Sequence, residues 1–388
     1  MFVPYARQSI NDDDIAAVAD VLRSEFLTQG PTVPAFEDAI ADHCKANYAV
    51  AMNSATSALH VACLALGVGP GDFVWTSPIS FVASANCAIY CGAQVDFVDI
   101  DSKTFNMSVD ALATKLAQAK LANKLPKVVI PVHLGGQSCD MATIYSLSQT
   151  YGFKIIEDAS HAIGGTYRGE PVGSCVFSDV TVLSFHPVKI ITSGEGGMAL
   201  TNDAALAESM NQIRTHGITR DARLYENASD GPWYYEQINL GFNYRLTDIA
   251  AALGLSQFQR LNSFVAKRNE IALNYDMLFS DTAITTPVIT SDAMSSFHLY
   301  IIQLPLLNSQ KQKFFEIARN NGVGLNVHYI PIYHHPYFLK MGFKSNDFPE
   351  AEKYYSEAIS IPMYADLGLD QQQHVASVLI STAATVIQ

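Results

Sequence analysis

Short apolar segments alternate with longer segments of helical periodicity through the first half of the chain. The strand-like segments are residues 48–52, 72–75, 94–100, 127–133, 154–157, 180–185 and 198–201. The helical patterns between them include residues 57–66, 82–90, 109–122 and 141–151, with Ser108 and Asp140 as capping residues. Strands joined through helices form a mainly parallel sheet. This alternation predicts an α/β domain whose ligand lies beyond the carboxyl ends of the strands.

The pattern changes after about residue 250. A long helical pattern covers residues 247–279, followed by a strand-like segment at 299–304, a helix near 310–320, a strand near 325–330 and closing helices. Near the start, residues 11–14 are typical of the cap of a helix that reaches about Arg23. We therefore expect an N-terminal arm at 1–13, a large α/β domain at 14–250 and a small C-terminal α+β domain at 251–388.

Composition limits the classes of partner and the cellular location. The chain has 24 basic and 37 acidic residues, a net charge of −13, which argues against nucleic acid and anionic membrane surfaces as partners. Its apolar runs are too short to cross a bilayer, and residues 1–7 lack the apolar segment of a secretory signal. Six cysteines occur without a CxxC pair, which is typical of reduced thiols. We expect a cytoplasmic protein.

Lys189 follows the apolar segment 180–183 and comes just before the glycine-rich segment 194–197. An amine at the end of a buried strand, beside backbone that a ligand can approach closely, can bond covalently to an aldehyde cofactor as a Schiff base. A lysine that only extends from a loop to water is the common alternative. The neighbouring motifs decide between the two interpretations.

Two motifs indicate a phosphate site. Residues 53–58 run from a strand into a helix, so that the backbone around Ala55 and the hydroxyl of Thr56 lie at a helix N-terminus, where a phosphate binds well. A plain helix cap is the alternative. Ser184, five positions before Lys189, can bond the same phosphate.

Two further motifs indicate an aromatic, nitrogen-containing ring. Asp158 ends the strand 154–157 and can bond a pyridinium nitrogen, while strand alternation turns its neighbour Glu157 to the other face. Phe81 opens a helix after another strand, where its ring can stack on a flat cofactor; a core phenylalanine is the alternative. Together with Lys189 and the phosphate motifs, these residues provide the parts needed to hold pyridoxal 5′-phosphate (PLP).

The same segments resemble the fold-type I PLP-dependent aminotransferases that act on nucleotide-linked keto-sugars, the DegT/DnrJ/EryC1/StrS family, over nearly the whole chain. The supporting segments are residues 27–31, 53–59, 80–83, 157–161, 184–189, 194–197 and 243–248. The resemblance implies the aspartate-aminotransferase-like fold, with Lys189 as the catalytic lysine that carries the cofactor covalently. It also implies that the cofactor passes through its pyridoxamine phosphate form during turnover. It also implies a homodimer, because Asn243 corresponds to a residue that reaches the phosphate in the neighbouring subunit.

Within the family, residues 79–83, 185–189, 252–257 and 327–333 are most similar to the aminotransferases of pseudaminic acid biosynthesis. This resemblance implies transfer from L-glutamate to C4 of UDP-2-acetamido-2,6-dideoxy-β-L-arabino-hex-4-ulose. Other nucleotide-linked 3- or 4-keto-sugars are the alternative substrates. The residues that correspond to the substrate pocket are Tyr5, Glu25, Phe26, Leu27, Thr28, Asn326, Val327, His328 and Tyr329.

One residue departs from many members of the family. His161 stands where they carry a glutamine that contacts the 3′-hydroxyl of the cofactor, and histidine can make the same bond. Because imidazole can titrate near neutral pH, we expect His161 to change the pH response of the enzyme.

Other classes fit less well. A related 3-dehydrase replaces the lysine with histidine, and residues 67–71 follow a helix and precede a strand, the reverse of a dinucleotide-binding fingerprint. His328, His334 and His335 match no standard metal site, so no metal is expected. A PLP-binding sensor without catalysis is an alternative of another class, and Lys189 together with Asp158 favours an enzyme.

Overall fold

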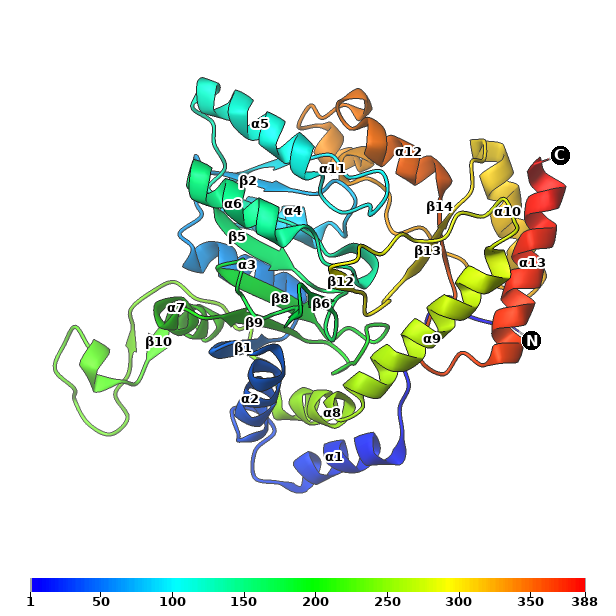
Figure 1. Ribbon diagram of the computed structural model, residues 1–388. Helices are drawn as coiled ribbons and strands as arrows, with labels where there is room; N and C mark the ends of the chain where they lie inside the picture. Colours follow the sequence, from blue (N-terminus) through cyan, green and yellow to red (C-terminus); the bar gives the residue numbers. More distant parts are fainter. Residues whose placement is uncertain (1, 388) are drawn as a thin grey trace.

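A seven-stranded sheet forms the centre of the protein in the computed structural model, which describes residues 2–387 (Figure 1). The strand order is β1-β9-β8-β5-β4-β2-β3. Strand β9 is antiparallel to both of its neighbours, and the other neighbouring pairs are parallel, so six strands run in one direction. The strands are β1 (Tyr48–Met52), β2 (Phe73–Thr76), β3 (Gln94–Phe97), β4 (Val128–Ile130), β5 (Lys154–Asp158), β8 (Val180–Ser184) and β9 (Gly197–Thr201).

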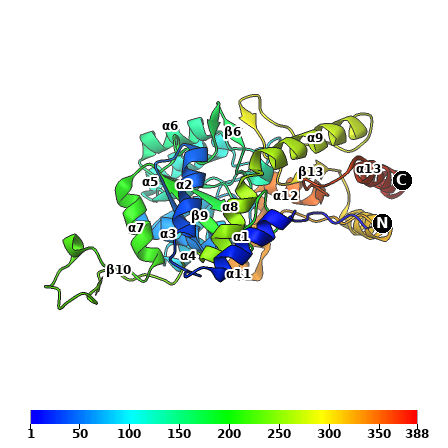
Figure 2. The same cartoon turned by 90° about the horizontal axis from the view of Figure 1, so that it is seen from below.

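Helices cover both faces of this sheet, which confirms the predicted α/β layers (Figures 1 and 2). One face carries α3 (Ala55–Ala65), α4 (Ala83–Tyr90) and α7 (Ala204–Arg214). The other face carries α2 (Thr32–Cys44), α5 (Val109–Ala122) and α6 (Met141–Tyr151). Side chains alternate along β5, so Ile156 packs into the first layer and Ile155 into the second. Ser108 and Asp140 cap α5 and α6, as predicted.

The C-terminal part is built on a two-stranded antiparallel sheet of β13 (Tyr300–Gln303) and β14 (Ala358–Ile361). Three helices pack with it, namely α9 (Leu261–Phe279), α10 (Asn308–Asn320) and α13 (Leu369–Ile387). The shorter α11 (Pro336–Leu339) and α12 (Pro349–Glu357) lie beside the large sheet (Figure 1). Two separate helices, α8 (Asp248–Phe258) and α9, occupy the region where one long helix was predicted at 247–279. The predicted boundary near residue 250 falls inside α8 and stays a prediction.

The strand predicted near residues 325–330 is wrong. Only an isolated bridge joins Asn326 to Ser360 there. The side chain of Asn326 accepts a hydrogen bond from the backbone N–H of Val327 (2.8 Å), so that this amide is not available to a neighbouring strand. The segment instead carries His328 and Tyr329 into a cavity.

The first residues connect the two parts of the molecule. Val3 forms a parallel bridge with Val323, and the chain then crosses to α1 (Asp12–Arg23), which packs against α8. Asn11 and Asp14 form a capping box, which confirms the predicted helix start. The buried Asp14 carboxylate also accepts hydrogen bonds from α8, including one from Gln257 Nε2 at 2.6 Å, and forms an ion pair with Arg260.

Residues 218–240 form an arm that projects from the part of the molecule built on the seven-stranded sheet (Figures 1 and 2). It holds the short pair β10 (Ile218–Thr219) and β11 (Glu236–Gln237) and exposes Trp233 and Leu240. A small sheet of β6 (Thr166–Tyr167), β7 (Glu170–Pro171) and β12 (Ala293–Met294) lies elsewhere on the surface. Across residues 2–387, the helices are all too short or too polar to span a bilayer.

Asp248 anchors the segment that precedes α2. Its fully buried carboxylate accepts hydrogen bonds from the backbone N–H groups of Gly30 (2.8 Å) and Thr32 (2.9 Å). Because Asp248→Ala leaves both amides without this acceptor, we expect the free energy of unfolding in urea to fall by about 2–4 kcal/mol. The control is Asp38→Ala on the exposed face of α2, which we expect to change it by less than about 0.5 kcal/mol. Equal effects would contradict the anchoring role.

Candidate active site

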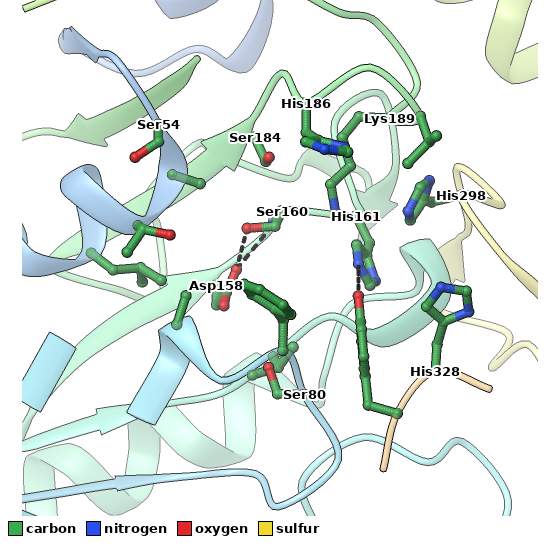
Figure 3. A pocket seen from close by; sticks show the side chains of 18 of the residues that line it. Ser54, Ser80, Asp158, Ser160, His161, Ser184, His186, Lys189, His298 and His328 are labelled. Carbon is green, nitrogen blue, oxygen red and sulfur yellow. Dashed lines mark hydrogen bonds between the residues drawn. The ribbon is translucent and has the colours of Figure 1, made fainter. Parts of the chain in front are cut away.

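A cavity of about 460 Å³ opens at the carboxyl ends of β1, β2, β5 and β8, as the parallel sheet predicts (Figure 3). Its wall includes residues from both the seven-stranded sheet with its helices and the C-terminal part. The lining residues are Tyr5, Ser54, Ala55, Thr56, Leu59, Ser80, Phe81, Ala83, Val132, Asp158, Ser160, His161, Ser184, His186, Val188, Lys189, Glu195, Gly196, His298, His328 and Tyr329.

One end of the cavity is formed by the N-terminus of α3. Ser54 caps this helix by accepting a hydrogen bond from Ser57 N (3.1 Å). The backbone N–H groups of Ala55 and Thr56 bond to no other group in the described part of the chain. Free amides at the positive end of a helix favour an anion. The hydroxyl of Ser184 lines the same cavity from the end of β8.

Gly197 allows β9 to begin directly beside this helix end. A Cβ atom at Gly197 would lie 2.3 Å from the backbone nitrogen of Ala55 and 2.4 Å from the carbonyl carbon of Ser54. No side chain fits into that space, since both neighbours are backbone atoms. The glycine therefore sets how closely α3 approaches the strand.

Asp158 is held in one orientation by three hydrogen bonds. Its Oδ1 accepts from the N–H (3.2 Å) and the hydroxyl (2.5 Å) of Ser160, and its Oδ2 accepts from the Ser84 hydroxyl (2.6 Å). Glu157 faces the other side of β5, where it pairs with His133 at 2.7 Å. The predicted alternation of the two acids is therefore confirmed, and only Asp158 reaches the cavity.

The amine of Lys189 points into the cavity from the loop after β8 (Figure 3). Burial lowers the pKa of this amine to about 8, because desolvation penalises the charged form, although the negative charge of Asp158 acts in the opposite direction. A lysine with such a pKa is neutral in a useful fraction of molecules at moderately alkaline pH. It is therefore suited to act as a nucleophile and a base.

Phe81 stands in the cavity wall with 59% of its surface exposed. A core phenylalanine, the alternative considered from the sequence, is normally buried. The exposed ring of Phe81 therefore presents a face on which a flat ligand in the cavity can stack.

His161 is buried and bonded at both ring nitrogens. Its Nδ1 accepts from the backbone N–H of Gly135 (3.3 Å), which places the proton on Nε2, the atom 3.0 Å from the Tyr329 hydroxyl. Burial, followed by the charges of Lys189 and His328, holds the pKa of His161 well below its usual value. The expectation that His161 titrates near neutral pH is therefore wrong, since its environment keeps the ring uncharged.

The predicted substrate residues divide into two groups. Tyr5, His328 and Tyr329 line the cavity, whereas Asn326 and Val327 lie in the same segment outside it. Glu25, Phe26, Leu27 and Thr28 are exposed and do not line the cavity, and Asn243 is also exposed outside it. Thr28 forms a β-bridge with Thr247, and Asn243 forms one with Thr215.

Three residues of the site were missed from the sequence, namely Ser84, Ser160 and His298, of which Ser160 and His298 line the cavity. Ser84 and Ser160 hold Asp158, and the spacing of Ser80 and Ser84 by one helical turn, with Ser160 two residues after Asp158, could have indicated them. His298 comes from the C-terminal part, far from the other motifs, and nothing in its local sequence indicated that it lines the cavity.

Comparison with known proteins identifies the family. The model of the DegT/DnrJ/EryC1/StrS aminotransferase family matches residues 8–380. The chain belongs to this family. It is therefore a PLP-dependent sugar aminotransferase with the predicted fold-type I architecture.

Three relatives illustrate the likeness. The chain is 38% identical to the spore coat polysaccharide biosynthesis protein SpsC of Bacillus subtilis, over 96% of this chain and 95% of the relative. It is 35% identical to a UDP-4-amino-4,6-dideoxy-N-acetyl-beta-L-altrosamine transaminase of Campylobacter jejuni, over 98% and 97%. The solved structure of Helicobacter pylori PseC, an aminotransferase involved in the biosynthesis of pseudoaminic acid, has a TM-score of 0.89 at 31% identity, over 99% and 100%.

The cavity of this aminotransferase fits PLP. The free amides of α3 and the close approach at Gly197 form a cradle for the phosphate, while Asp158 and Phe81 fit the pyridine nitrogen and one face of the ring. Lys189 stands within the same cavity for the aldehyde carbon. Bound PLP supplies an electron sink for the carbon that loses or gains the amine.

The cradle at Gly197 predicts a cofactor-binding defect. In Gly197→Ala, the new methyl group displaces the N-terminus of α3, and we expect the Kd for PLP, measured by absorbance titration, to rise at least about tenfold, the loss of one charge-assisted hydrogen bond. The control is Gly69→Ala, because a Cβ at Gly69 meets no atom within 4 Å. An unchanged Kd in Gly197→Ala would contradict the cradle.

The pKa of Lys189 predicts how PLP incorporation depends on pH. The neutral amine is the reactive form, so the rate at which the cofactor-free protein takes up PLP should rise with pH and level off above about 8. An unperturbed lysine would continue to accelerate up to about pH 10.4. Stopped-flow absorbance distinguishes the two profiles, and a rate still rising at pH 10 would refute the lowered pKa.

Proposed function

We propose that this enzyme transfers the amino group of L-glutamate to C4 of UDP-2-acetamido-2,6-dideoxy-β-L-arabino-hex-4-ulose in pseudaminic acid biosynthesis. The observation that carries the reaction class is the convergence of Lys189, Asp158 and Phe81 on one cavity. The choice of substrate is supported by the likeness to the Campylobacter transaminase and to PseC. Glutamate as the donor rests on the resemblance described above.

In this proposal each cavity residue has one task toward the cofactor. The amides of Ala55 and Thr56 and the hydroxyl of Ser184 bind the phosphate, and Asp158 accepts a hydrogen bond from the protonated pyridine nitrogen. Phe81 stacks on the ring, and Nε2 of His161 exchanges its bond to the Tyr329 hydroxyl for one to the 3′-hydroxyl of the cofactor. The hydrogen bonds from Ser84 and Ser160 favour the charged form of Asp158, which the ring nitrogen requires.

Lys189 is the group that moves protons. Once the amine of glutamate has displaced it, Lys189 is free to take the proton from the α-carbon of glutamate. In the second half of the reaction it delivers a proton to C4 of the sugar. A pKa of about 8 suits both directions, because the amine is close to the balance between its two protonation states at working pH.

We propose that Tyr5, His328 and Tyr329 contact the keto-sugar. Tyr5 reaches the cavity from the N-terminal segment, and His328 and Tyr329 reach it from the C-terminal part. The residues outside the cavity are proposed to serve a second subunit. Asn243 and the segment from Glu25 to Thr28 are exposed, and Thr28 bridges to Thr247 a few residues after Asn243, so they are available to the cavity of a partner in a homodimer. The cofactor, L-glutamate and the UDP-linked sugar complete the set of partners.

A second candidate is amino transfer to another nucleotide-linked 3- or 4-keto-sugar. The identity of 38% to SpsC, a protein of spore coat polysaccharide biosynthesis, favours it. The cofactor residues do not separate these substrates, since they act on the amine and not on the sugar.

A substrate panel tests the proposal. The PLP-loaded enzyme is incubated with glutamate and UDP- or dTDP-linked 3- and 4-keto-sugars, and the product stereochemistry is read by NMR. We expect the UDP-linked 4-keto-β-L-arabino sugar to give the highest kcat/KM and to be aminated at C4. The control, Lys189→Ala, should lose turnover and the visible absorbance of the covalently held cofactor together. Preference for a dTDP-linked sugar would overturn the substrate assignment, and a fully active Lys189→Ala enzyme would overturn the mechanism.

A further inference from the structure

His298 brings an imidazole into the cavity from the C-terminal part, just before β13. Its backbone is held from two sides. Arg268 Nη1, from α9, donates to the carbonyl oxygens of Phe297 (3.0 Å) and His298 (3.4 Å). Ser296 donates its hydroxyl to the carbonyl oxygen of His161 (2.9 Å). The backbone that carries the ring is therefore held in place by the protein itself.

The ring of His298 has no hydrogen-bond partner in the described protein. The residue is 4% exposed, and its Nδ1 is enclosed without a partner. Nε2 also makes no hydrogen bond to residues 2–387, but unlike Nδ1 it is not fully enclosed. Nε2 is therefore the nitrogen that faces the cavity. An unpaired acceptor is tolerated inside a protein more often than an unpaired N–H. The proton is thus favoured on Nε2, and His298 presents a donor to the cavity.

Two other buried histidines of the cavity already have hydrogen-bond partners. His161 is bonded to Gly135 and Tyr329, and His328 is bonded through Nδ1 to Ser360 at 2.8 Å. His186 also lines the cavity but is exposed to solvent. No arginine lines the cavity in the part of the chain that the structure describes. The buried Ser184 hydroxyl also has no partner in the described protein, but it is assigned above to the phosphate. Among the buried histidines of the cavity, His298 is therefore the one that offers a donor without a partner, its Nε2–H.

The location of His298 indicates which oxygen it binds. The ring lies beside Lys189 and contacts His161, with a distance of 4.4 Å between ring centroids, whereas the α3 end of the cavity lies on the far side of Asp158 (Figure 3). His298 is therefore remote from the phosphate end. The carbon on which Lys189 acts is the α-carbon of the amino donor, and its carboxylate is one bond away.

We propose that His298 binds the α-carboxylate of the amino donor through Nε2–H. This inference rests on the proposed function, since it takes an α-amino acid as the donor. The surroundings support a neutral donor, because burial and the nearby His161, Lys189, Arg268 and His328 hold the pKa of His298 well below its usual value. A neutral imidazole can release the carboxylate again when the product, an oxo acid, leaves.

Two amino ligands, one with an α-carboxylate and one without it, test whether His298 binds this group. α-Methylglutamate has no α-hydrogen, so it binds to the PLP enzyme without being turned over, and 4-aminobutyrate lacks the α-carboxylate but keeps the amine and the distal carboxylate. The Kd of each is measured from the change in the visible spectrum. We expect His298→Phe to raise the Kd of α-methylglutamate by about 10- to 100-fold, the loss of one hydrogen bond to a charged group, and to leave the Kd of 4-aminobutyrate within about threefold.

A conservative variant and a matched control complete the design. His298→Gln keeps an N–H near the position of Nε2, and we expect it to restore most of the affinity for α-methylglutamate. His374→Phe makes the same substitution at a half-buried position of α13 outside the cavity wall and should leave both Kd values unchanged. If His298→Phe does not hold PLP, the comparison of the two ligands is made on His298→Gln and His298→Leu.

Measuring the two half-reactions separately shows whether His298 binds the carboxylate of the donor or an oxygen of the sugar. In His298→Phe, the pyridoxamine-phosphate form should react with the keto-sugar at the wild-type rate, while its formation from glutamate slows. A slower half-reaction with the keto-sugar would overturn the inference. An equal rise in the Kd of α-methylglutamate and of 4-aminobutyrate would also overturn it. If the wild-type enzyme shows no spectral response to glutamate, the proposed donor itself is wrong, a failure distinct from an unchanged His298→Phe variant.

Discussion

The close approach of β9 to the N-terminus of α3 is the contact on which the cavity depends. Gly197 permits it, since the nearest atoms to a side chain at this position would be backbone atoms of Ser54 and Ala55. Strand β9 also pairs with β8, which ends at Ser184 in front of the loop of Lys189. One glycine thus brings the free amides of α3, the serine of β8 and the lysine of the following loop around the same space.

The cavity holds its ionisable groups in defined states by burial and by hydrogen bonds. Asp158 is surrounded by hydroxyl donors from Ser84 and Ser160, which favour its charged form. Burial moves Lys189 in the opposite direction, toward its neutral form, and keeps His161 and His298 uncharged. An enzyme that moves protons between a lysine and a carbon benefits from neighbours that do not compete for the proton.

Local patterns predicted most of the large layer. All seven strands and the helices α3 to α6 were expected within a few residues of their ends, because buried strands and amphipathic helices have distinct periodicities. The segment at residues 325–330 failed because a side chain, Asn326, bonds its own backbone there. The break between α8 and α9 was also not predicted, since the helical spacing of Phe258, Leu261 and Phe264 continues across it without a proline or glycine.

The sequence by itself determined the kinds of residue at the strand ends, and with them the expectation of PLP, Lys189, Asp158, Thr56, Ser184 and Phe81. These residues each follow a strand or begin a helix, so their direction is readable from local rules. Only the tertiary structure decided the protonation of His161 and the presence of His298, which comes from a segment more than one hundred residues after Lys189. Protonation and enclosure depend on what surrounds a side chain in three dimensions, and neighbours that are distant along the chain leave no mark on the local sequence.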